Sequence, residues 1–328
     1  MSACRICGNV EENRTHAVRE MMFGTRDSFE YVECGRCGCL QIAEYPKDLG
    51  TYYPSDYWDF QKRRMPAVHP GKGFRHWVSQ RRTRYWLTDK KDWLGRILAW
   101  HTPIPRHVSW LRRGGIRDMD ISVLDVGCGL GDRLLALRGA GLSRLEGVDP
   151  FIAEDVTYPN GVRVFRKSVF DVQGQYDLIT LHHSFEHMQE PVAVLEKLRS
   201  LVAPEGVVLL RIPVAAAAWK EYGVHWVQID APRHLYLHTV ESLGIAAQKA
   251  GLTVERVHFD STAFQFWGSE QYRQDIMLYE PRSYEYGLAR SIFTADQIAD
   301  FARKSRELNK EGIGDQACFY LRNDLFSP

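Results

Sequence analysis

A glycine-rich turn between a buried strand and a helix constrains this chain more than any other feature. The run from Val123 to Asp132 (VLDVGCGLGD) places an apolar strand, an acid and three alternate glycines before a helical segment. Glycines at the carboxyl end of a parallel strand let a ligand lie against bare backbone at a helix N-terminus. The spacing G-x-G-x-G differs from the G-x-G-x-x-G of dinucleotide folds. Asp125 beside the glycines suits a cationic ligand that carries an amino group and a sulfonium.

A second acid stands where a ribose diol is usually held. Asp149 ends the next predicted strand, 24 residues after Asp125, and an acid about 20 residues past such a loop typically binds ribose hydroxyls. The loop, the two acids and their order resemble motif I and the following strand of class I S-adenosylmethionine (SAM) methyltransferases. The resemblance implies SAM as the cofactor and S-adenosylhomocysteine as the product. The implied cofactor-binding residues are Asp125, Gly127, Gly129, Gly131, Asp149, Pro150, Ser168, Val169 and His182. Ser168 and Val169 fall at the adenine position, although the aspartate expected there is missing.

Strands and helices alternate through the rest of the C-terminal two-thirds. Further strands are predicted at 162–166, 176–181, 207–213, 252–259 and 316–322, and helices at 191–202 and 240–250. This rhythm predicts an α/β fold with helices on both faces of the sheet. The resemblance implies a Rossmann-like seven-stranded sheet with an antiparallel last strand. Residues 263–312 form an insertion before that strand, with a helix predicted in 295–308.

Two cysteine knuckles lie near the N-terminus. Cys4 and Cys7 form one C-x-x-C pair, and Cys34 and Cys37 form the other. Four thiolates at this spacing favour a structural zinc in a small ribbon, with no open position for chemistry. The alternative is a pair of disulfides, but no signal peptide is evident, so we expect a reducing, cytoplasmic compartment. Cys39 is adjacent and breaks the two-knuckle pattern.

Charge is unevenly distributed along the chain, and positive charge is concentrated between the cysteine knuckles and the glycine-rich turn. The net charge is +1, yet residues 61–118 hold 15 Lys or Arg against three Asp. Trp86, Trp93 and Trp100 stand seven residues apart among these charges, so one helix would place them on a single stripe. Such a helix either packs its stripe on the catalytic domain or binds an anionic partner: a membrane surface, a pyrophosphate-linked glycan or RNA. We therefore predict a zinc ribbon (1–45), a basic Trp-rich helical linker (46–118) and a methyltransferase domain (119–328).

The whole arrangement resembles a bacterial family of zinc-ribbon class I methyltransferases that decorate sugars. The resemblance is carried by the knuckles, the segment 49–58 (LGTYYPSDYW) and the SAM motifs. In the deoxysugar C-methyltransferases of this family, a Glu-His-Leu-x-Tyr segment after strand five carries a general base. The matching segment here is Arg233-His234-Leu235-Tyr236. Arginine replaces the glutamate, and a further C-terminal domain of those relatives is missing, so an oxygen acceptor is favoured, with a phosphate or carboxylate near Arg233.

Methyl transfer to a hydroxyl needs a base, and histidine is the natural one near neutral pH. His234 is the first candidate, followed by His183 after strand four and His225 after strand five. The predicted reaction is O-methylation of a sugar hydroxyl in a bacterial surface glycan or its activated precursor. The acceptor is then a glycan, a nucleotide-sugar or a lipid-linked sugar. Residues 61–118 add a peripheral contact with an anionic inner-membrane face.

Three alternatives stay open at the level of sequence. A ribosomal RNA base methyltransferase also joins a zinc ribbon to this fold, and the basic linker would suit RNA. Against it, the turn His182-His183-Ser184-Phe185 lacks the Asn-Pro-Pro-Tyr-like pattern of enzymes that methylate base amines. A sugar C-methyltransferase and a non-catalytic SAM-binding partner protein are the other two.

Overall fold

A mixed eight-stranded sheet forms the centre of the protein in a computed structural model that describes residues 3–53, 72–88 and 92–324. Part of the segment 49–58 and the basic residues 62–64, 90 and 91 fall outside these ranges. In these ranges the strand order is β11-β12-β9-β8-β4-β5-β7-β6. The strands are β4 (Ser122–Val126), β5 (Arg144–Val148), β6 (Val156–Thr157), β7 (Arg163–Phe165), β8 (Tyr176–His182), β9 (Val202–Pro213), β11 (Leu252–Phe259) and β12 (Gln316–Asn323).

The central strands are parallel and the last strand is not. β4 pairs in parallel with β5 and β8, and β8 pairs in parallel with β9. β12 lies between β9 and β11 and is antiparallel to both. The predicted α/β fold with an antiparallel last strand is therefore confirmed, and the two-residue edge strand β6 is an addition that the sequence did not predict.

Successive residues of the inner strands face two separate cores. On β9, Val207 and Leu209 belong to one apolar cluster, whereas Val208 and Leu210 belong to the other. This alternation is the period of two that a strand imposes on its side chains. The sheet therefore buries both faces, as a parallel sheet requires.

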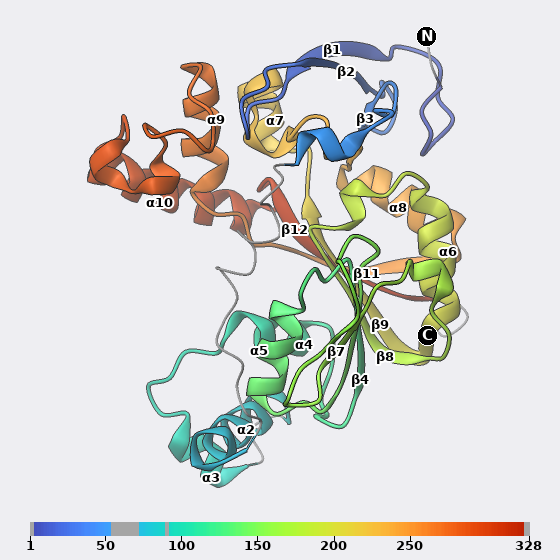
Figure 1. Ribbon diagram of the computed structural model, residues 1–328, viewed down its shortest axis with the longest axis vertical. Coiled ribbons are helices and arrows are strands. Elements are labelled where there is room, and N and C mark those ends of the chain that lie inside the picture. Colours follow the sequence, from blue (N-terminus) through green and yellow to red (C-terminus); the bar gives the residue numbers. More distant parts are fainter. Residues whose placement is uncertain (1–2, 54–71, 89–91, 325–328) are drawn as a thin grey trace.

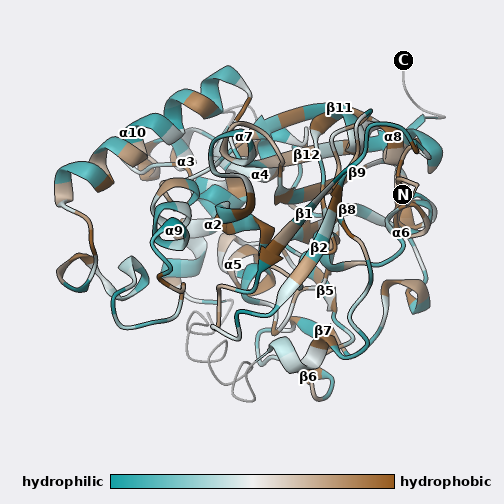
Figure 2. Cartoon of the chain, turned by 90° about the horizontal axis from the view of Figure 1, so that it is seen from above, coloured by the Kyte–Doolittle hydropathy of each residue, from teal (hydrophilic) through white to brown (hydrophobic). Residues whose placement is uncertain are grey.

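Helices cover each face of the sheet. α2 (Phe74–Leu87), α4 (Arg106–Arg113) and α5 (Asp132–Ala140) pack together on one side. α6 (Pro191–Leu201) and α8 (Val240–Lys249) lie on the other side (Figures 1 and 2). The remaining helices are α3 (Trp93–Leu98), α7 (Ala217–Tyr222), α9 (Phe264–Arg273) and α10 (Ala295–Glu311). No helix among the described residues is long and apolar enough to cross a membrane.

The basic linker folds differently from the single helix that the sequence predicted. α2 ends at Leu87 and α3 begins at Trp93, where the Asp92 side chain accepts a hydrogen bond from Gly95 N and caps the new helix. The expectation of one stripe of tryptophans is wrong, because Trp86 is buried while Trp93 is 72% exposed and Trp100 is 68% exposed. A capping aspartate favours the start of a new helix, which the spacing of the tryptophans did not show.

The N-terminal segment forms a second, antiparallel sheet. Its order is β1 (Arg14–Arg19), β2 (Ser28–Glu33), β3 (Leu40–Ile42) and β10 (Tyr236–Leu237). β10 comes from the chain after β9, and its Leu237 pairs with Leu40 of β3. The ribbon at the top of Figure 1 is thus completed by a strand from the methyltransferase-like part of the chain.

A buried arginine joins the two sheets. Arg233 is 2% exposed, and its guanidinium donates to Glu20, Asp230 and the carbonyl oxygen of Tyr52. The carboxylate of Glu20 also accepts hydrogen bonds from the four consecutive amides of residues 22–25. The expected phosphate or carboxylate of an acceptor at Arg233 is therefore wrong, because protein carboxylates already occupy this side chain.

The insertion before β12 packs against the ribbon and against the segment that precedes Arg233. The predicted helix in 295–308 is confirmed as α10, and α9 was not predicted. Trp267 of α9 and Phe293 pack with Met21 of the ribbon and with Val227, which lies in the 3-10 turn η5 (Val227–Ile229). The insertion therefore contacts the ribbon and the segment that precedes His234.

Breaking the Arg233 ion pairs should destabilise the protein strongly. Arg233→Ala leaves Glu20 and Asp230 buried without their partner, which costs about 3–5 kcal/mol. Arg303→Ala removes an exposed ion pair on α10 and should cost about 1 kcal/mol or less. Urea unfolding of both variants measures the difference, and equal losses would contradict this account.

Candidate active site

The glycine loop between β4 and α5 presents bare backbone. Gly127, Gly129 and Gly131 have φ angles of +68°, +55° and +82°. A Cβ on Gly127 would lie 2.4 Å from the Cβ of Ser184. Backbone conformation and close packing therefore both require glycine here, and the loop leaves room for a ligand at the start of α5.

Asp149 ties this loop to the end of β5. Its Oδ2 accepts from Gly129 N at 2.9 Å, and its Oδ1 accepts from Phe151 N at 2.9 Å. Burial raises the pKa of Asp149. Each carboxylate oxygen keeps a further lone pair, so Asp149 can accept hydrogen bonds from a ribose diol while it holds the loop. Pro150 follows it at the surface.

Asp125 provides a buried acceptor without a complete set of partners. It is 2% exposed, and its Oδ1 accepts from the Thr180 hydroxyl at 2.7 Å. Its Oδ2 has no hydrogen-bond partner among the described residues. Burial raises the pKa of Asp125 to about 6. A bound cation at this edge would compensate the buried carboxylate, so the site fits the amino group and sulfonium of SAM.

Two phenylalanines that the sequence reasoning missed stand at the predicted adenine position. Phe151 follows β5 and is 75% exposed, and Phe170 follows β7 and is 50% exposed. β5 and β7 are parallel neighbours, so both residues come after the same edge of the sheet. Ser168 accepts from Phe170 N at 3.3 Å and Val169 is buried. An exposed aromatic residue directly after a strand-end acid was the signal that could have identified Phe151.

The linker covers the far side of the site. His182, the last residue of β8, is buried against Trp110 of α4 with ring centroids 4.5 Å apart. Burial lowers the pKa of His182, which favours a neutral ring beside a cationic donor. Trp110 was not among the predicted site residues, because nothing in the local sequence connects α4 with β8.

His183 has both ring nitrogens engaged. Its Nε2 lies 2.6 Å from Nη1 of Arg211, whose Nε donates to Asp260 at 2.8 Å. Arginine only donates hydrogen bonds, so Nε2 is the acceptor and Nδ1 carries the proton toward Glu186 Oε1 at 3.3 Å. This arrangement leaves no lone pair on His183 for an acceptor hydroxyl.

His234 has a free acceptor nitrogen. Its Nδ1 lies 2.7 Å from the carbonyl oxygen of Gln228 and therefore donates to it. Its Nε2 faces Glu186 Oε1 at 3.9 Å and Asp230 Oδ2 at 3.8 Å. A proton taken up on Nε2 would be stabilised by both carboxylates, so the geometry suits a general base.

The third candidate base lies elsewhere. His225 belongs to the 3-10 turn η4 (Gly223–His225), which packs against β1, α7 and α9. Burial and the nearby Arg19 and Arg273 lower its pKa. Among the described residues, His225 forms no hydrogen bond or ion pair with His183 or His234. The structure therefore brings only His183 and His234 together, around Glu186.

Two further acceptors, Glu186 and His187, lie beside the candidate base. The ligand atoms of Glu186, His187 and His234 all lie within 4.8 Å of one another. Nδ1 of His183 lies 3.3 Å from Glu186 Oε1, and neither carboxylate oxygen accepts a hydrogen bond of regular geometry among the described residues. Burial raises the pKa of Glu186, but three histidines outweigh burial and lower the pKa to about 2. His187 donates from Nδ1 to the carbonyl oxygen of Arg233 at 2.8 Å. Such a group can share a proton or hold a divalent cation.

The cysteine cluster has the geometry of a tetrahedral site. The Sγ atoms of Cys4 and Cys37 lie 3.8 Å apart, and those of Cys7 and Cys34 lie 3.5 Å apart. Four sulfurs bonded to zinc at about 2.3 Å would be separated by about 3.8 Å. All four cysteines are free of disulfides, and Cys39 does not belong to the group. The donor set therefore fits a zinc ion.

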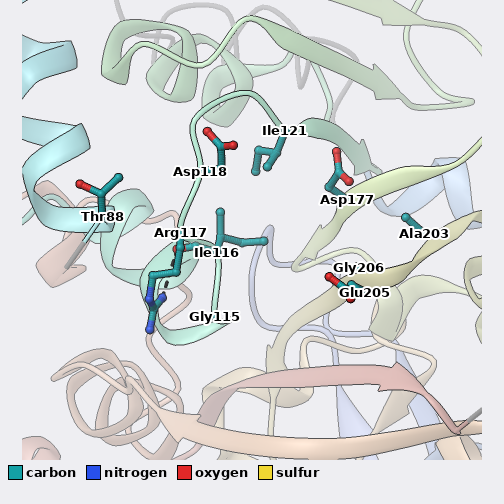
Figure 3. A pocket seen from close by; sticks show the side chains of 10 residues that line it. All are labelled: Thr88, Gly115, Ile116, Arg117, Asp118, Ile121, Asp177, Ala203, Glu205 and Gly206. Atoms are coloured by element: carbon teal, nitrogen blue, oxygen red, sulfur yellow. Dashed lines mark hydrogen bonds between the residues drawn. The ribbon is translucent and has the colours of Figure 1, made fainter. Parts of the chain in front are cut away.

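A hollow of about 490 Å³ lies at the opposite edge of the sheet. Figure 3 shows Asp118 and Ile121 ahead of β4 and Asp177 at the start of β8 around it. Ligands of open α/β sheets bind outside the carboxyl ends of the strands, so this hollow is not the SAM site.

Comparisons with known proteins agree with this geometry. The family profile described as a methyltransferase domain matches residues 92–257, half of the chain. The chain belongs to this methyltransferase family. With the glycine loop and the strand topology, this membership makes the protein a class I SAM-dependent methyltransferase.

Curated relatives of the methyltransferase match over a shorter stretch. Ubiquinone biosynthesis O-methyltransferase of Azotobacter vinelandii is 32% identical over 116 residues, which are 32% of this chain and 50% of that protein. The Pseudomonas aeruginosa enzyme of the same name is 31% identical over 121 residues, or 34% and 51%. The chain thus spans about half the length of these relatives.

Solved methyltransferase structures are similar at low identity. One is a putative sarcosine dimethylglycine methyltransferase from Galdieria sulphuraria, with a TM-score of 0.42 and 16% identity over 66% of this chain and 83% of that one. Another is the O-methyltransferase of a trans-AT PKS multienzyme from Brevibacillus brevis in complex with S-adenosyl-L-homocysteine, with a TM-score of 0.41 and 15% identity over 75% and 80%.

Removing the Asp149 carboxylate should weaken cofactor binding. Asp149→Ala loses charge-assisted hydrogen bonds to the ribose and should reduce the affinity for SAM and S-adenosylhomocysteine by about 1.5–3 kcal/mol. Asp120→Ala, an exposed change ahead of β4, should have no effect. Calorimetric titration measures both affinities. An unchanged affinity in Asp149→Ala would remove this residue from the site.

Proposed function

We propose that this methyltransferase O-methylates a sugar hydroxyl of a bacterial surface glycan or of its nucleotide-linked or lipid-linked precursor. The observation that carries the proposal is the free Nε2 of His234, held by the Gln228 carbonyl and faced by two carboxylates. His234 stands in the segment that resembles the base segment of zinc-ribbon sugar methyltransferases. The two ubiquinone biosynthesis relatives are also named O-methyltransferases.

The residues around His234 account for the proton in this reaction. SAM supplies an electrophilic methyl group on a positively charged sulfur. As the acceptor oxygen bonds to the methyl carbon and the carbon–sulfur bond breaks, Nε2 of His234 takes the hydroxyl proton. Glu186 and Asp230 stabilise the resulting imidazolium. The buried surroundings strengthen these charge interactions and exclude water.

Arg233 favours an oxygen acceptor over a carbon acceptor. The C-methylating relatives carry a glutamate where this chain has Arg233. Arg233 is buried in ion pairs with Glu20 and Asp230 and is permanently protonated. It therefore cannot remove a proton from carbon, and a hydroxyl needs only the single base that His234 provides.

We further propose that Cys4, Cys7, Cys34 and Cys37 hold one structural zinc ion. A closed Cys4 site leaves no position for a substrate. The metal would fix the two knuckles of the ribbon, and the ribbon in turn contacts β10 and the carbonyl oxygen of His234 through Tyr31. Zinc would thus affect catalysis only by fixing the positions of β10 and of the backbone at His234.

The zinc proposal predicts about one zinc per chain in protein purified without chelator. Cys4→Ser should lose the metal, because three thiolates no longer close the tetrahedron. Cys39→Ala should keep it, since Cys39 lies outside the cluster. Elemental analysis measures the zinc content. A zinc-free protein with two disulfides in its mass spectrum would contradict the proposal.

Loss of the base should lower turnover without affecting the donor. His234→Ala should reduce turnover by roughly 10²–10⁴-fold with little change in SAM affinity, because a base acts in the transition state. His225→Ala should retain most of the activity. Steady-state kinetics and calorimetry on both variants separate the two effects. Full turnover in His234→Ala would refute the assignment of the base.

The acceptor is identified by the product that disappears. A strain lacking the gene should lose one O-methyl sugar from its surface glycans, and the purified protein should restore it with SAM in extracts. Unchanged glycans together with a lost methyl group in ribosomal RNA would replace the glycan proposal with the RNA alternative. A lost C-methyl branch would instead identify a C-methyltransferase.

A further inference from the structure

Large apolar side chains are exposed along α3 and the start of α2. Trp93, Ile97 and Trp100 are 72%, 59% and 68% exposed. Trp93 and Ile97 are four residues apart and share one face of α3, and Trp100 follows two residues after the helix ends. Phe74 is 76% exposed and stacks on Trp77 with centroids 5.8 Å apart. We call these five side chains the α2–α3 surface.

This surface is not the result of loose packing. α2 and α3 contact each other, and a Cβ on Gly95 would lie 2.3 Å from the carbonyl oxygen of Arg81. Trp86, Leu87 and Ala99 of the same segment are buried. The two helices therefore bury one set of apolar residues and leave another facing solvent, at the end of the molecule opposite the ribbon (Figure 1).

Positive charge surrounds the exposed apolar residues. The described residues 72–88 and 92–118 include ten Lys or Arg and two Asp. Lys72, Arg75 and Arg96 are exposed. None of the three forms an ion pair with an acid in the described part of the chain. Cations beside exposed tryptophans are the composition of a surface that contacts anionic headgroups and inserts aromatic rings at the interface.

The aliphatic members of the segment favour lipid over nucleic acid. Bases stack on aromatic rings and on arginine, but Ile97 and the neighbouring Ile104, 37% exposed, offer no such platform. Both side chains gain free energy when they enter hydrocarbon.

The same segment leads to the active site. Ile104 precedes α4, where Trp110 packs on His182 and lies over Arg211. A bilayer that binds the α2–α3 surface would therefore engage the chain directly ahead of the helix that covers the site.

We propose that the α2–α3 surface binds the surface of an anionic phospholipid bilayer. The proposal does not depend on the identity of the acceptor, because it rests on exposure and charge alone. Tryptophan rings enter the interface and the basic side chains contact lipid phosphates. Binding of this kind weakens with salt, since the charges are exposed.

The test uses the full purified chain and vesicles of defined composition. Vesicles of phosphatidylglycerol and phosphatidylethanolamine should bind the protein, whereas pure phosphatidylcholine vesicles should bind it at least tenfold more weakly. Tryptophan fluorescence should shift to shorter wavelength on binding. Trp93→Ser with Trp100→Ser, and separately Arg75→Ala with Arg96→Ala, should each weaken binding at least tenfold and leave SAM affinity unchanged.

A matched control lies on the opposite part of the molecule. Arg290→Ala with Arg306→Ala removes two exposed charges from the insertion and should leave vesicle binding intact. Absence of binding to anionic vesicles, or an equal loss in this control, would overturn the proposal. Binding of polyuridine RNA that depends on Trp93 and Trp100, without vesicle binding, would also overturn it and assign the surface to RNA.

Discussion

The position of the segment that carries His234 depends on the buried guanidinium of Arg233. A charge in a protein interior persists only with opposite charges and hydrogen-bond acceptors around it. Here Glu20 comes from the ribbon and Asp230 from the segment after β9, so one side chain fixes both to each other. His234 is the next residue along the chain. Its position is therefore set by an ion-pair network whose members are more than 200 residues apart in sequence.

The ribbon consequently contacts the segment that carries His234, the proposed base. Tyr31 of β2 donates to the carbonyl oxygen of His234 at 2.7 Å, and Ile42 N donates to the carbonyl oxygen of Leu235. These contacts hold the backbone of His234 and of the residue after it. Gln228 then sets which ring nitrogen carries the proton. The ribbon, the Arg233 ion pairs and His234 form one chain of contacts, in which only the last member would touch the acceptor.

Local patterns in the sequence predicted the parts of the fold that local chemistry determines. The apolar run at 316–322 became β12, whose first six residues are buried, and the run at 252–259 became the partly exposed edge strand β11. β10 was not predictable in this way, because a two-residue strand exists only through its partner β3, about 200 residues away. The role of Arg233 was missed for the same reason: an arginine beside a histidine suggests an anion in solution, and the sequence does not show that Glu20 folds against it.

The candidate site likewise has one part that the sequence predicted and one part that it did not. The glycines lie in one turn after β4 and Asp149 ends the next strand along the chain, so their spacing alone indicated a nucleoside-binding site. Among the candidate bases, the sequence placed His234 ahead of His183 and His225 by resemblance and position, without showing the contacts of any of the three. Their difference lies in hydrogen bonds to Arg211 and to the Gln228 carbonyl, which depend on how distant strands are packed.

The central claim is that the fold fixes one tautomer of His234, with the proton on Nδ1 and the lone pair on Nε2. Nitrogen-15 NMR of histidine-labelled protein, with the His234 signals assigned through His234→Gln, measures this directly. The account predicts a protonated Nδ1 and an unprotonated Nε2 in the resting enzyme at a pH where the ring is neutral. A proton on Nε2, or rapid exchange between the two nitrogens, would contradict it.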